Sequence, residues 1–336
     1  MKYIAYTVKG LEEVARQEIK DVVREVNFAE VKSKRIVFET KDTKTVTDLK
    51  TVDDICLLIA TGEVSSANEV LDTVKNINLE TVKEQIQQYR KVGDSFSITF
   101  SLAKTKIKTE ELQSSLAKII SEGYRWKYTE FDHSNFDIRI FIDTKDLYIC
   151  VRLTEKPLFH RRYRTASSKG GLRPSIAAAM VRLTTLGDKG TVVDNFCGSG
   201  TILAEAYIQG NAIAGGDIED IAIDATLENL SHLGCKTEGN IRKLDALKTP
   251  WKDGQFDFAI SNLPWDKQIE ITSVTDLYVG TLSEYARILK PEGRLCLLVS
   301  KPDLLIKHAK AFFPKKKIEK IQIGFLGQTP SIITIV

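Results

Sequence analysis

The spacing of apolar residues predicts alternating strands and helices over the first 160 residues. Short segments rich in β-branched and aromatic residues predict strands, and apolar residues at intervals of three and four predict helices. The predicted strands cover residues 3–8, 35–40, 54–61, 95–102, 136–143 and 147–153, and the predicted helices cover residues 11–23, 46–49, 79–89 and 109–120. This order favours two successive α+β units with helices on one side of an antiparallel sheet.

From about residue 174 the pattern changes to regular strand–helix repeats. The predicted strands cover residues 190–195, 211–217, 240–245, 256–261 and 293–300, and helices are predicted between them, as at 202–209 and 221–233. Such alternation predicts a mostly parallel sheet with helices on both faces. Two last strands, 320–326 and 331–336, are joined by a connection too short for a parallel crossover, so the final strand must run antiparallel. That strand distinguishes methyltransferase-like folds from dinucleotide-binding Rossmann folds.

A glycine-containing turn follows the first strand of this second region. Residues 192–201 read Val-Val-Asp-Asn-Phe-Cys-Gly-Ser-Gly-Thr. Gly198 and Gly200 permit positive φ, and the free N–H groups at the start of the next helix can hold a carboxylate or a phosphate. The dinucleotide fingerprint is incomplete, because Leu203 stands where it requires glycine or alanine. Taken alone, the two glycines fit an ordinary tight turn as well as a cofactor site.

Two aspartates strengthen the cofactor interpretation. Asp217 and Asp245 end the second and third predicted strands of this region. Ligands of open α/β sheets bind at the carboxyl ends of the strands, so both side chains and the glycine turn are expected to face one crevice. A carboxylate at position 217 can accept hydrogen bonds from both hydroxyls of a ribose. Either aspartate alone is more typical of a helix cap or a turn.

The fourth strand of the region leads into Asn262-Leu263-Pro264-Trp265. The glycine turn, the acidic residue at 217, the segment 244–246 (Leu-Asp-Ala) and this tetrapeptide resemble, in order and spacing, the S-adenosylmethionine-dependent amino-methyltransferases of the Asn/Asp-Pro-Pro-Tyr class. Leucine stands at 263 where proline is usual in that class, and tryptophan stands at 265 where tyrosine or phenylalanine is usual.

Two further segments are similar to the THUMP-domain RNA guanine-N2-methyltransferases within that class. They are Leu172-Arg-Pro-Ser-Ile-Ala-Ala-Ala and Thr7-Val-Lys-Gly-Leu-Glu. The resemblance covers about residues 170–336 and is weaker over residues 1–160. It implies an α/β chain with an N-terminal α+β ferredoxin-like domain (1–62), a THUMP RNA-binding domain (63–155), a basic linker (156–173) and a Rossmann-like methyltransferase domain (174–336) with a seven-stranded sheet.

The resemblance also implies the cofactor and the substrate. S-adenosylmethionine is expected as the cofactor, and the N2 amine of a guanosine in tRNA is expected as the methyl acceptor. The residues implied in cofactor binding are Asp194, Phe196, Gly198, Gly200, Thr201, Asp217, Ile218, Asp245, Ala246 and Asn262.

The chemistry of the tetrapeptide fits such a reaction. The lone pair of an amine conjugated to a purine ring is delocalised, so the amine is a poor nucleophile. The side-chain oxygen of Asn262 and the carbonyl oxygen of Leu263 can accept its two N–H groups and hold its lone pair in line with the methyl group. Pro264 rigidifies the turn, and Trp265 can stack on a base that has been flipped out of a duplex. A strand–helix turn with a packed tryptophan is the alternative interpretation.

Positive charge is concentrated where the two regions meet. The whole chain carries 48 Lys and Arg against 45 Asp and Glu, a net charge of +3, which does not by itself indicate a nucleic-acid-binding protein. Residues 151–173 hold seven cationic residues against Glu155, a local net charge of +6. A run of charge is usually only a solvated face, but this one lies at the predicted junction. The predicted RNA-binding residues are Lys104, Lys106, Lys108, Arg161, Arg162, Arg164, Lys169 and Arg173.

Composition excludes several other classes of protein. A chain of 336 residues with 43% hydrophobic content predicts about two folded domains. Its five cysteines form no C-x-x-C pair and its four histidines lack ligand spacing, so we expect neither a disulfide framework nor a bound metal. No apolar run is long enough to span a membrane. We expect a cytoplasmic monomer.

The residues alone leave other functions open. An rRNA guanine-N2 or DNA amino-methyltransferase would share the second region, and a protein glutamine methyltransferase uses a similar tetrapeptide. An RNA-binding protein with a vestigial cofactor domain is the non-enzymatic alternative.

Overall fold

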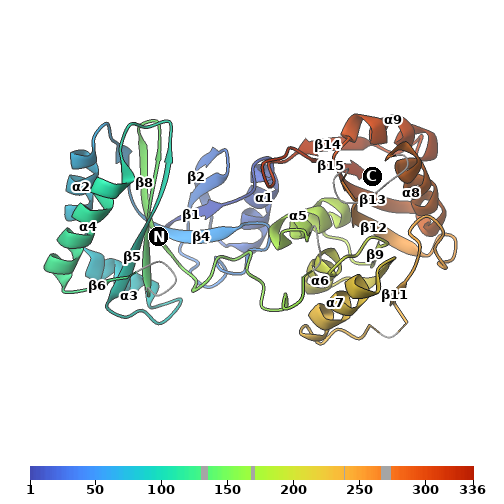
Figure 1. The fold of residues 1–336 in the computed structure, drawn as a ribbon, viewed down its shortest axis with the longest axis horizontal. Coiled ribbons are helices and arrows are strands. Elements are labelled where there is room, and N and C mark those ends of the chain that lie inside the picture. Colours follow the sequence, from blue (N-terminus) through green and yellow to red (C-terminus); the bar gives the residue numbers. More distant parts are fainter. Residues whose placement is uncertain (130–134, 168–170, 238, 266–273) are drawn as a thin grey trace. The chain divides into compact units, whose positions relative to one another are not determined.

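The computed structural model describes residues 1–129, 135–167, 171–237, 239–265 and 274–336. The chain divides into two compact units. The first unit contains Met1–Tyr6, Ile19–Leu49 and Asp53–Leu158, and the second contains Thr7–Glu18, Lys50–Val52 and Phe159–Val336. The second unit therefore includes two short segments from the N-terminal part of the sequence. Figure 1 labels most of the elements of both units.

A single eight-stranded sheet forms the centre of the first unit, in the order β2-β3-β1-β4-β8-β7-β5-β6. Its strands are β1 (Lys2–Tyr6), β2 (Asn27–Lys32), β3 (Arg35–Glu39), β4 (Asp54–Glu63), β5 (Ser95–Ala103), β6 (Lys127–Tyr128), β7 (Phe136–Asp143) and β8 (Asp146–Arg152). The helices near it in sequence are α1 (Glu12–Val22), which is shared between the two units, α2 (Ala67–Lys75), α3 (Leu79–Ile86) and α4 (Thr109–Tyr124). Helix α2 packs against α4.

Two predictions for this unit were wrong. The sheet is mixed, because β5 pairs parallel with both β6 and β7 while the other pairs are antiparallel. Helix α4 supplies the crossover that a parallel pair requires. The helix predicted at residues 46–49 is absent, since residues 46 and 47 form a turn and residues 48 and 49 have no regular structure; so short an apolar repeat cannot nucleate a helix on its own. The domain boundary predicted after residue 62 stays a prediction.

The second unit is built on a seven-stranded sheet in the order β11-β10-β9-β12-β13-β15-β14. Its strands are β9 (Thr191–Asp194), β10 (Ala212–Asp217), β11 (Ile241–Lys243), β12 (Phe256–Asn262), β13 (Leu289–Val299), β14 (Ile318–Gln322) and β15 (Ser331–Ile335). Strands β9 to β13 pair in parallel, and β15 runs antiparallel to both β13 and β14. The mostly parallel sheet with an antiparallel last strand is therefore confirmed.

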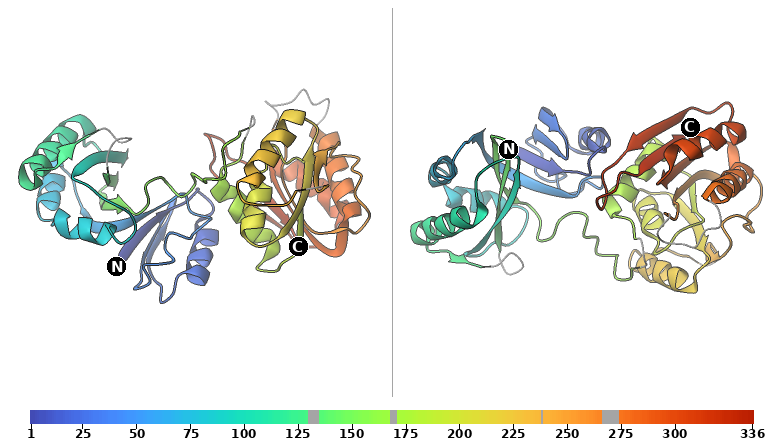
Figure 2. Two further views of the ribbon diagram at one scale, coloured as in Figure 1. Left: turned by 90° about the horizontal axis from the view of Figure 1, so that it is seen from below. Right: turned by 45° about the horizontal axis from the view of Figure 1, so that its top comes forward.

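Helices cover both faces of this sheet. They are α5 (Pro174–Thr185), α6 (Thr201–Ile208), α7 (Asp220–Ser231), α8 (Val274–Ile288) and α9 (Pro302–Phe312). One hydrophobic cluster joins α5, α6 and α7 to one face, and a second joins α8 and α9 to the other. The left view of Figure 2 shows the green and yellow helices on one side of the sheet and the orange and red helices on the other.

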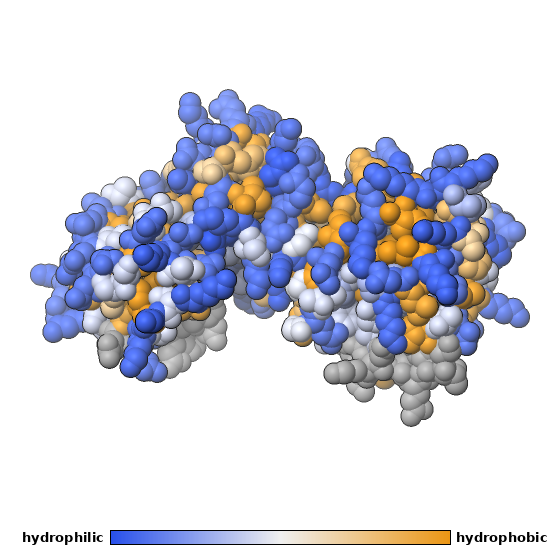
Figure 3. Space-filling model, turned by 90° about the horizontal axis from the view of Figure 1, so that it is seen from above, coloured by the Kyte–Doolittle hydropathy of each residue, from blue (hydrophilic) through white to orange (hydrophobic). Residues whose placement is uncertain are grey.

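Some large apolar side chains remain exposed. They are Met1, Val31, Leu186, Ile218, Ile221, Leu247 and Leu326. Figure 3 shows hydrophobic residues in orange between hydrophilic residues in blue on one face of the molecule. Among the described residues, no helix is long and apolar enough to cross a membrane.

Candidate active site

The carboxyl ends of the parallel strands bring the predicted cofactor residues to one edge of the second unit. Asp194 ends β9, Asp217 ends β10 and Asn262 ends β12. Asp245 lies in the turn that follows β11. The strand register, in which Gly215 stands opposite Asp194, places these residues at the same edge. These residues therefore lie at the same ends of the strands although they are up to 68 positions apart in the chain, and their role in cofactor binding stays a prediction.

The glycine turn is held in place by its neighbours. The N–H of Gly198 donates to Oδ2 of Asp217 at 2.9 Å, and its carbonyl oxygen accepts from the hydroxyl of Thr226 on α7 at 2.8 Å. Gly200 caps α6 with φ of 75°, and a Cβ at this position would lie 2.9 Å from the Thr226 side chain. Glycine at 200 is thus required for packing against α7 as well as for the backbone conformation.

The carboxylate of Asp217 is partly exposed and keeps acceptor capacity. Its oxygens accept from the backbone N–H groups of Gly198 and of Glu219, the latter at 3.2 Å. Each carboxylate oxygen can accept a second hydrogen bond. Ile218, the next residue, is 62% exposed. Asp245 is also exposed and accepts from the N–H of Leu247 at 2.9 Å, and Ala246 is half-buried.

Asp194 is buried beneath the turn and does not face solvent. Its Oδ1 accepts from the Ser261 hydroxyl at 2.5 Å and from the N–H of Phe196 at 3.0 Å. Burial raises the pKa of Asp194 to about 7. The Ser261 hydroxyl also contacts the hydroxyl of Tyr285 on α8, which accepts from the N–H of Asn195. Ser261 immediately precedes Asn262, so this network joins the glycine turn to the tetrapeptide.

The sequence carries no signal that points to Ser261, Tyr285 or Thr226. Tyr285 lies 91 residues after Asp194, and no spacing rule connects the two residues. Their role becomes visible only once β9, β12 and α8 are packed together.

The tetrapeptide presents polar atoms without partners. Oδ1 of Asn262 is buried and accepts no hydrogen bond from any described residue. The peptide after it is fixed, because the N–H of the fully buried Leu263 donates to the carbonyl oxygen of Leu298 at 3.1 Å. Thr201 Oγ1 at the start of α6 and Ser300 Oγ after β13 are likewise buried, with no hydrogen-bond partner in the described part of the chain. Buried polar groups are nearly always satisfied in native proteins, so these atoms indicate a place for a ligand.

Trp265 is packed more tightly than its predicted role suggests. It is 8% exposed, and its ring meets that of Phe325 edge-on, with centroids 6.3 Å apart. Its Nε1 is buried, and no described residue accepts a hydrogen bond from it. Pro264 is half-buried beside it.

The predicted RNA-binding residues differ in their surroundings. Arg161 pairs with Glu205 of α6, with Nε 2.8 Å from Oε1, and also donates to the carbonyl oxygen of Lys50. The fully buried Glu205 accepts a further hydrogen bond from the Tyr163 hydroxyl. Arg162 is exposed and Arg164 is half-buried. The sequence had not singled out Glu205.

The remaining cations of this set lie elsewhere. The guanidinium of Arg173 stands 4.8 Å from the centre of the Phe159 ring. Lys104, Lys106 and Lys108 are exposed in the first unit, between β5 and α4. Lys169 lies outside the described residues.

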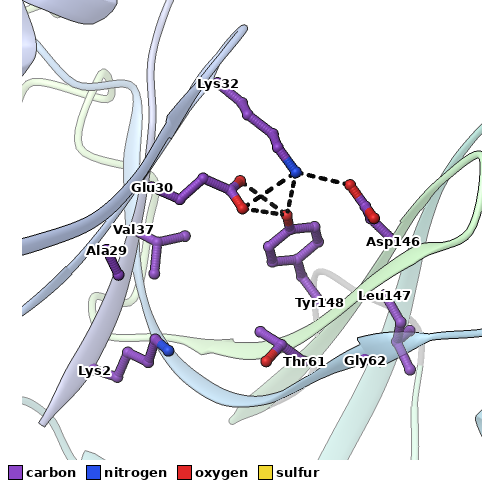
Figure 4. A pocket seen from close by; sticks show the side chains of 10 residues that line it. All are labelled: Lys2, Ala29, Glu30, Lys32, Val37, Thr61, Gly62, Asp146, Leu147 and Tyr148. Atoms are coloured by element: carbon purple, nitrogen blue, oxygen red, sulfur yellow. Dashed lines mark hydrogen bonds and ion pairs between the residues drawn. The ribbon is translucent and has the colours of Figure 1, made fainter.

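The first unit also contains a cavity of about 200 Å³. Figure 4 shows its lining, where the ammonium of Lys32 lies among Asp146, Glu30 and Tyr148. Lys2, the other lysine of the lining, pairs with Glu39. Because both cations are engaged, this cavity is a poor site for a phosphate group.

Metal ligands do not gather in the described part of the chain, where no three His, Cys, Asp or Glu side chains come together as a possible site. The expectation that no metal is needed stays a prediction.

Known proteins resemble this chain in sequence. A family model described as "RMKL-like, methyltransferase domain" matches residues 161–329. The U6 snRNA (guanine-N(2))-methyltransferase THUMPD2 of Bos taurus is 24% identical over 298 residues, which are 86% of this chain and 57% of that protein. The tRNA (guanine(6)-N2)-methyltransferase of Thermus thermophilus is 29% identical over 202 residues, 59% of each chain. The chain spans about half the length of the curated relatives it matches.

Solved structures share the fold over nearly the whole chain. TrmN from Thermus thermophilus aligns with a TM-score of 0.82 at 20% identity, covering 99% of this chain and 98% of that one. SMU.472, a putative methyltransferase complexed with SAH, aligns with a TM-score of 0.74 at 18% identity, covering 99% and 97%.

These comparisons confirm the resemblance predicted for the C-terminal region. The family model does not reach residues 1–160, so the THUMP assignment rests on the sequence alone. The matched residues contain the glycine turn, Asp217, Asp245 and the tetrapeptide. The chain belongs to the family of RMKL-like methyltransferase domains.

Proposed function

We propose that this chain transfers a methyl group from S-adenosylmethionine to the exocyclic N2 amine of a guanosine in tRNA. The observation that carries the proposal is the buried, unpartnered Oδ1 of Asn262 at the carboxyl end of β12. This oxygen can accept a hydrogen bond, and the exocyclic amine of a base can donate one to it. It lies at the edge where the glycine turn and Asp217 gather.

The residues at this edge fit the proposed cofactor. When bound, S-adenosylmethionine supplies a methyl group on a positively charged sulfur. The free lone pairs of Asp217 would accept the ribose hydroxyls, and the exposed Ile218 would cover an apolar face of the adenine. The unpartnered hydroxyl of Thr201, at the first turn of α6, is a further polar group for the amino-acid end. Asp194 would act from below by fixing the turn, since it is buried against Ser261.

The tetrapeptide would position the amine. Oδ1 of Asn262 and the carbonyl oxygen of Leu263 would each accept one N–H, which directs the nitrogen lone pair away from the protein and toward the methyl group. The hydrogen bond from the Leu263 N–H to Leu298 fixes the peptide between Asn262 and Leu263, which lies between the two acceptors, before the substrate arrives, so little reorganisation is needed. Catalysis would come from positioning.

Trp265 would contribute to the same pocket. Stacking on the base would need more of its ring face than the 8% of the residue that is exposed, so we expect the packing against Phe325 to loosen when the base enters. Its unpartnered Nε1 offers one more donor at the site.

An RNA substrate is supported by the relatives and by the local charge. The curated relatives cited above are named as guanine-N2-methyltransferases of U6 snRNA and of tRNA, and the tRNA assignment for this chain is our proposal. The exposed Arg162 and the half-buried Arg164 are the best placed cations of the linker for phosphate contacts, with Lys104, Lys106 and Lys108 as a second group. A phosphate contact by Arg161 would have to compete with Glu205.

The test is methyl transfer followed by nucleoside analysis. The chain is incubated with labelled S-adenosylmethionine in three parallel reactions, which contain unmodified tRNA transcripts, rRNA or DNA. The proposal expects label in tRNA as N2-methylated guanosine, and mapping then gives the position. Label in rRNA or DNA alone would select the corresponding rival. Failure to bind S-adenosylmethionine would favour the vestigial RNA-binding protein.

A further inference from the structure

We propose that Leu326, at the tip of the β14–β15 hairpin, is a wedge that enters the base stack of the RNA beside the target guanosine. The inference rests on the proposed function and deepens it, since it identifies how a base held in a helix would be exposed to Asn262. A wedge is needed because a stacked base cannot reach a pocket at the edge of the sheet.

The strand register places the hairpin tip at the catalytic edge. Asn262 stands opposite Leu298 on β13, and Val299 stands opposite Ser331, which in turn pairs with Gln322. The residues between 322 and 331 therefore extend past the same edge of the sheet at which β12 ends. The right view of Figure 2 shows this hairpin, in red, reaching out from the sheet.

The base of the tip touches the tetrapeptide directly. Phe325 packs edge-on against Trp265, and both residues belong to the same hydrophobic cluster. Leu326 follows Phe325 in the chain but is 75% exposed. The molecule thus holds a large apolar side chain in solvent one residue away from a contact with the proposed catalytic motif.

The backbone at Leu326 is unfavourable for a leucine. Phe325 and Gln328 form two mutual backbone hydrogen bonds of 3.0 and 2.9 Å, which leaves Leu326 and Gly327 as a two-residue turn. Their φ angles are 50° and 74°. Such turns strongly prefer Asn, Asp or Gly at the first position, because a bulky side chain at positive φ is strained. A leucine that is both strained and exposed contributes nothing evident to folding, and such residues cluster at functional sites.

Backbone contacts with residues 9 and 10 hold the hairpin in place, as insertion into a base stack would require. The N–H of Gly324 donates to the carbonyl oxygen of Lys9 at 2.9 Å. Gly10, with φ of 95°, lies so close that a Cβ there would be 2.1 Å from the carbonyl oxygen of Gln322. Lys9 is exposed beside the hairpin, with no ion pair to any described residue. Its ammonium is suited to a phosphate next to the inserted leucine.

The chemistry of the partner follows from these features. Apolar side chains that insert between bases unstack them, and leucine is among those that do so. Insertion would fill the space that the flipped guanosine leaves, while Lys9 contacts the adjacent backbone. An already unpaired guanosine would not need this assistance.

The experiment compares three variants on two RNAs. Leu326→Asn removes the apolar side chain and suits the turn better than leucine. Leu326→Met keeps an apolar side chain of similar size. Leu186→Asn is the matched control, because Leu186 is also exposed and has φ of 53°, but it follows α5 at the opposite edge of the sheet. The RNAs are the folded tRNA transcript mapped above and a short unpaired RNA with the same guanosine and its neighbours.

The wedge predicts that Leu326→Asn lowers kcat/KM on the folded tRNA by about tenfold or more, with little loss on the unpaired RNA. S-adenosylmethionine affinity and the melting temperature should not fall. Leu326→Met and Leu186→Asn should behave like the unmodified chain. An equal loss on both RNAs, or no loss on the folded tRNA, would overturn the wedge. If the unmodified chain methylates neither RNA, the proposed function itself fails and the wedge fails with it.

A second measurement covers the case in which the unpaired RNA is too short to be used by the chain. With 2-aminopurine placed next to the mapped guanosine in the folded tRNA, binding of the unmodified chain should raise its fluorescence as the neighbour unstacks. Leu326→Asn should bind without that rise. A rise equal to that of the unmodified chain would overturn the wedge.

Discussion

Buried polar groups are arranged in opposite ways at two sites of the molecule, one in each unit. In the first unit, Asp54 of β4 lies between two guanidinium groups, at 2.8 Å from Arg139 and 2.9 Å from Arg152. At the carboxyl ends of the strands of the second unit, three side-chain oxygens are buried with no hydrogen-bond partner among the residues that the structure describes: Oδ1 of Asn262, Oγ1 of Thr201 and Oγ of Ser300. Burying an unsatisfied polar group costs free energy.

This contrast distinguishes buried polar groups that stabilise the fold from buried polar groups that are available to a ligand. A buried carboxylate with charged partners holds strands together, whereas a buried amide oxygen without a partner is stable only if something else supplies the donor. The same distinction applies to the arginines of the linker. Arg161 forms an ion pair with Glu205 within the fold, whereas Arg162 is exposed to solvent. Three substitutions test the distinction.

Arg161→Met should have the largest effect on stability. It leaves Glu205 buried without its cation, and breaking a buried ion pair in this way costs about 3–5 kcal/mol. Urea denaturation of the full chain measures the change in the free energy of unfolding. A double variant, Arg161→Met with Glu205→Leu, should recover most of the loss because no unpaired charge remains. A single variant as stable as the unmodified chain would show that the pair is not structural.

Asp194→Asn should remove a pH dependence of stability. Burial raises the pKa of Asp194 to about 7 in the folded chain, whereas an unfolded Asp releases its proton near pH ~4. The folded state therefore binds more protons between about pH 4 and pH 7, and the free energy of unfolding falls as pH rises across this window, by up to about 4 kcal/mol.

The variant tests this because Asn keeps the acceptor oxygen for Ser261 and does not titrate. Its free energy of unfolding, measured from pH 5 to 8, should fall less steeply than that of the unmodified chain. Asp224→Asn makes the same replacement on the exposed face of α7 and should leave the slope unaltered. Identical slopes for all three proteins would contradict a buried, protonated Asp194.

Arg162→Ala should have the smallest effect. Stability should change by no more than about 0.5 kcal/mol, because the side chain is exposed. Affinity for tRNA should fall modestly. The slope of log affinity against log salt concentration should become less steep by about 1, the amount expected for the loss of one phosphate contact. Lys252→Ala removes an exposed cation outside the linker and should change neither quantity. An unchanged salt slope in Arg162→Ala would remove this residue from the RNA-binding surface.

The sequence predicted the second unit better than the first. Regular strand–helix repeats identify a parallel sheet, and the carboxyl ends of its strands follow from the topology, so Asp217, Asp245 and Asn262 could be grouped from their positions along the chain. Helix α2 was missed even though Ser66 and Glu69 form a capping pair at its start, because its apolar stripe is short. The parallel pairs of β5 were missed because propensity does not report strand direction.

Contacts between side chains that are distant in the chain could not be predicted from the sequence. Nothing in the run of arginines separates Arg161 from Arg162, since the difference is made by Glu205, 44 residues further on. Ser261, Tyr285 and Thr226 have no motif of their own. The strain at Leu326 is likewise a property of the turn, because a Leu-Gly pair alone does not predict a positive φ.

The central claim is that the unpartnered oxygen of Asn262 awaits the substrate amine, and one comparison tests it most directly. Methyl transfer to the mapped tRNA and S-adenosylmethionine affinity are measured for the unmodified chain and for Asn262→Ala, with the exposed Asn240→Ala as control. We expect Asn262→Ala to lose about 100-fold to 1000-fold in methyl transfer, while cofactor affinity is largely retained. Methyl transfer by Asn262→Ala at the rate of the unmodified chain would contradict the account.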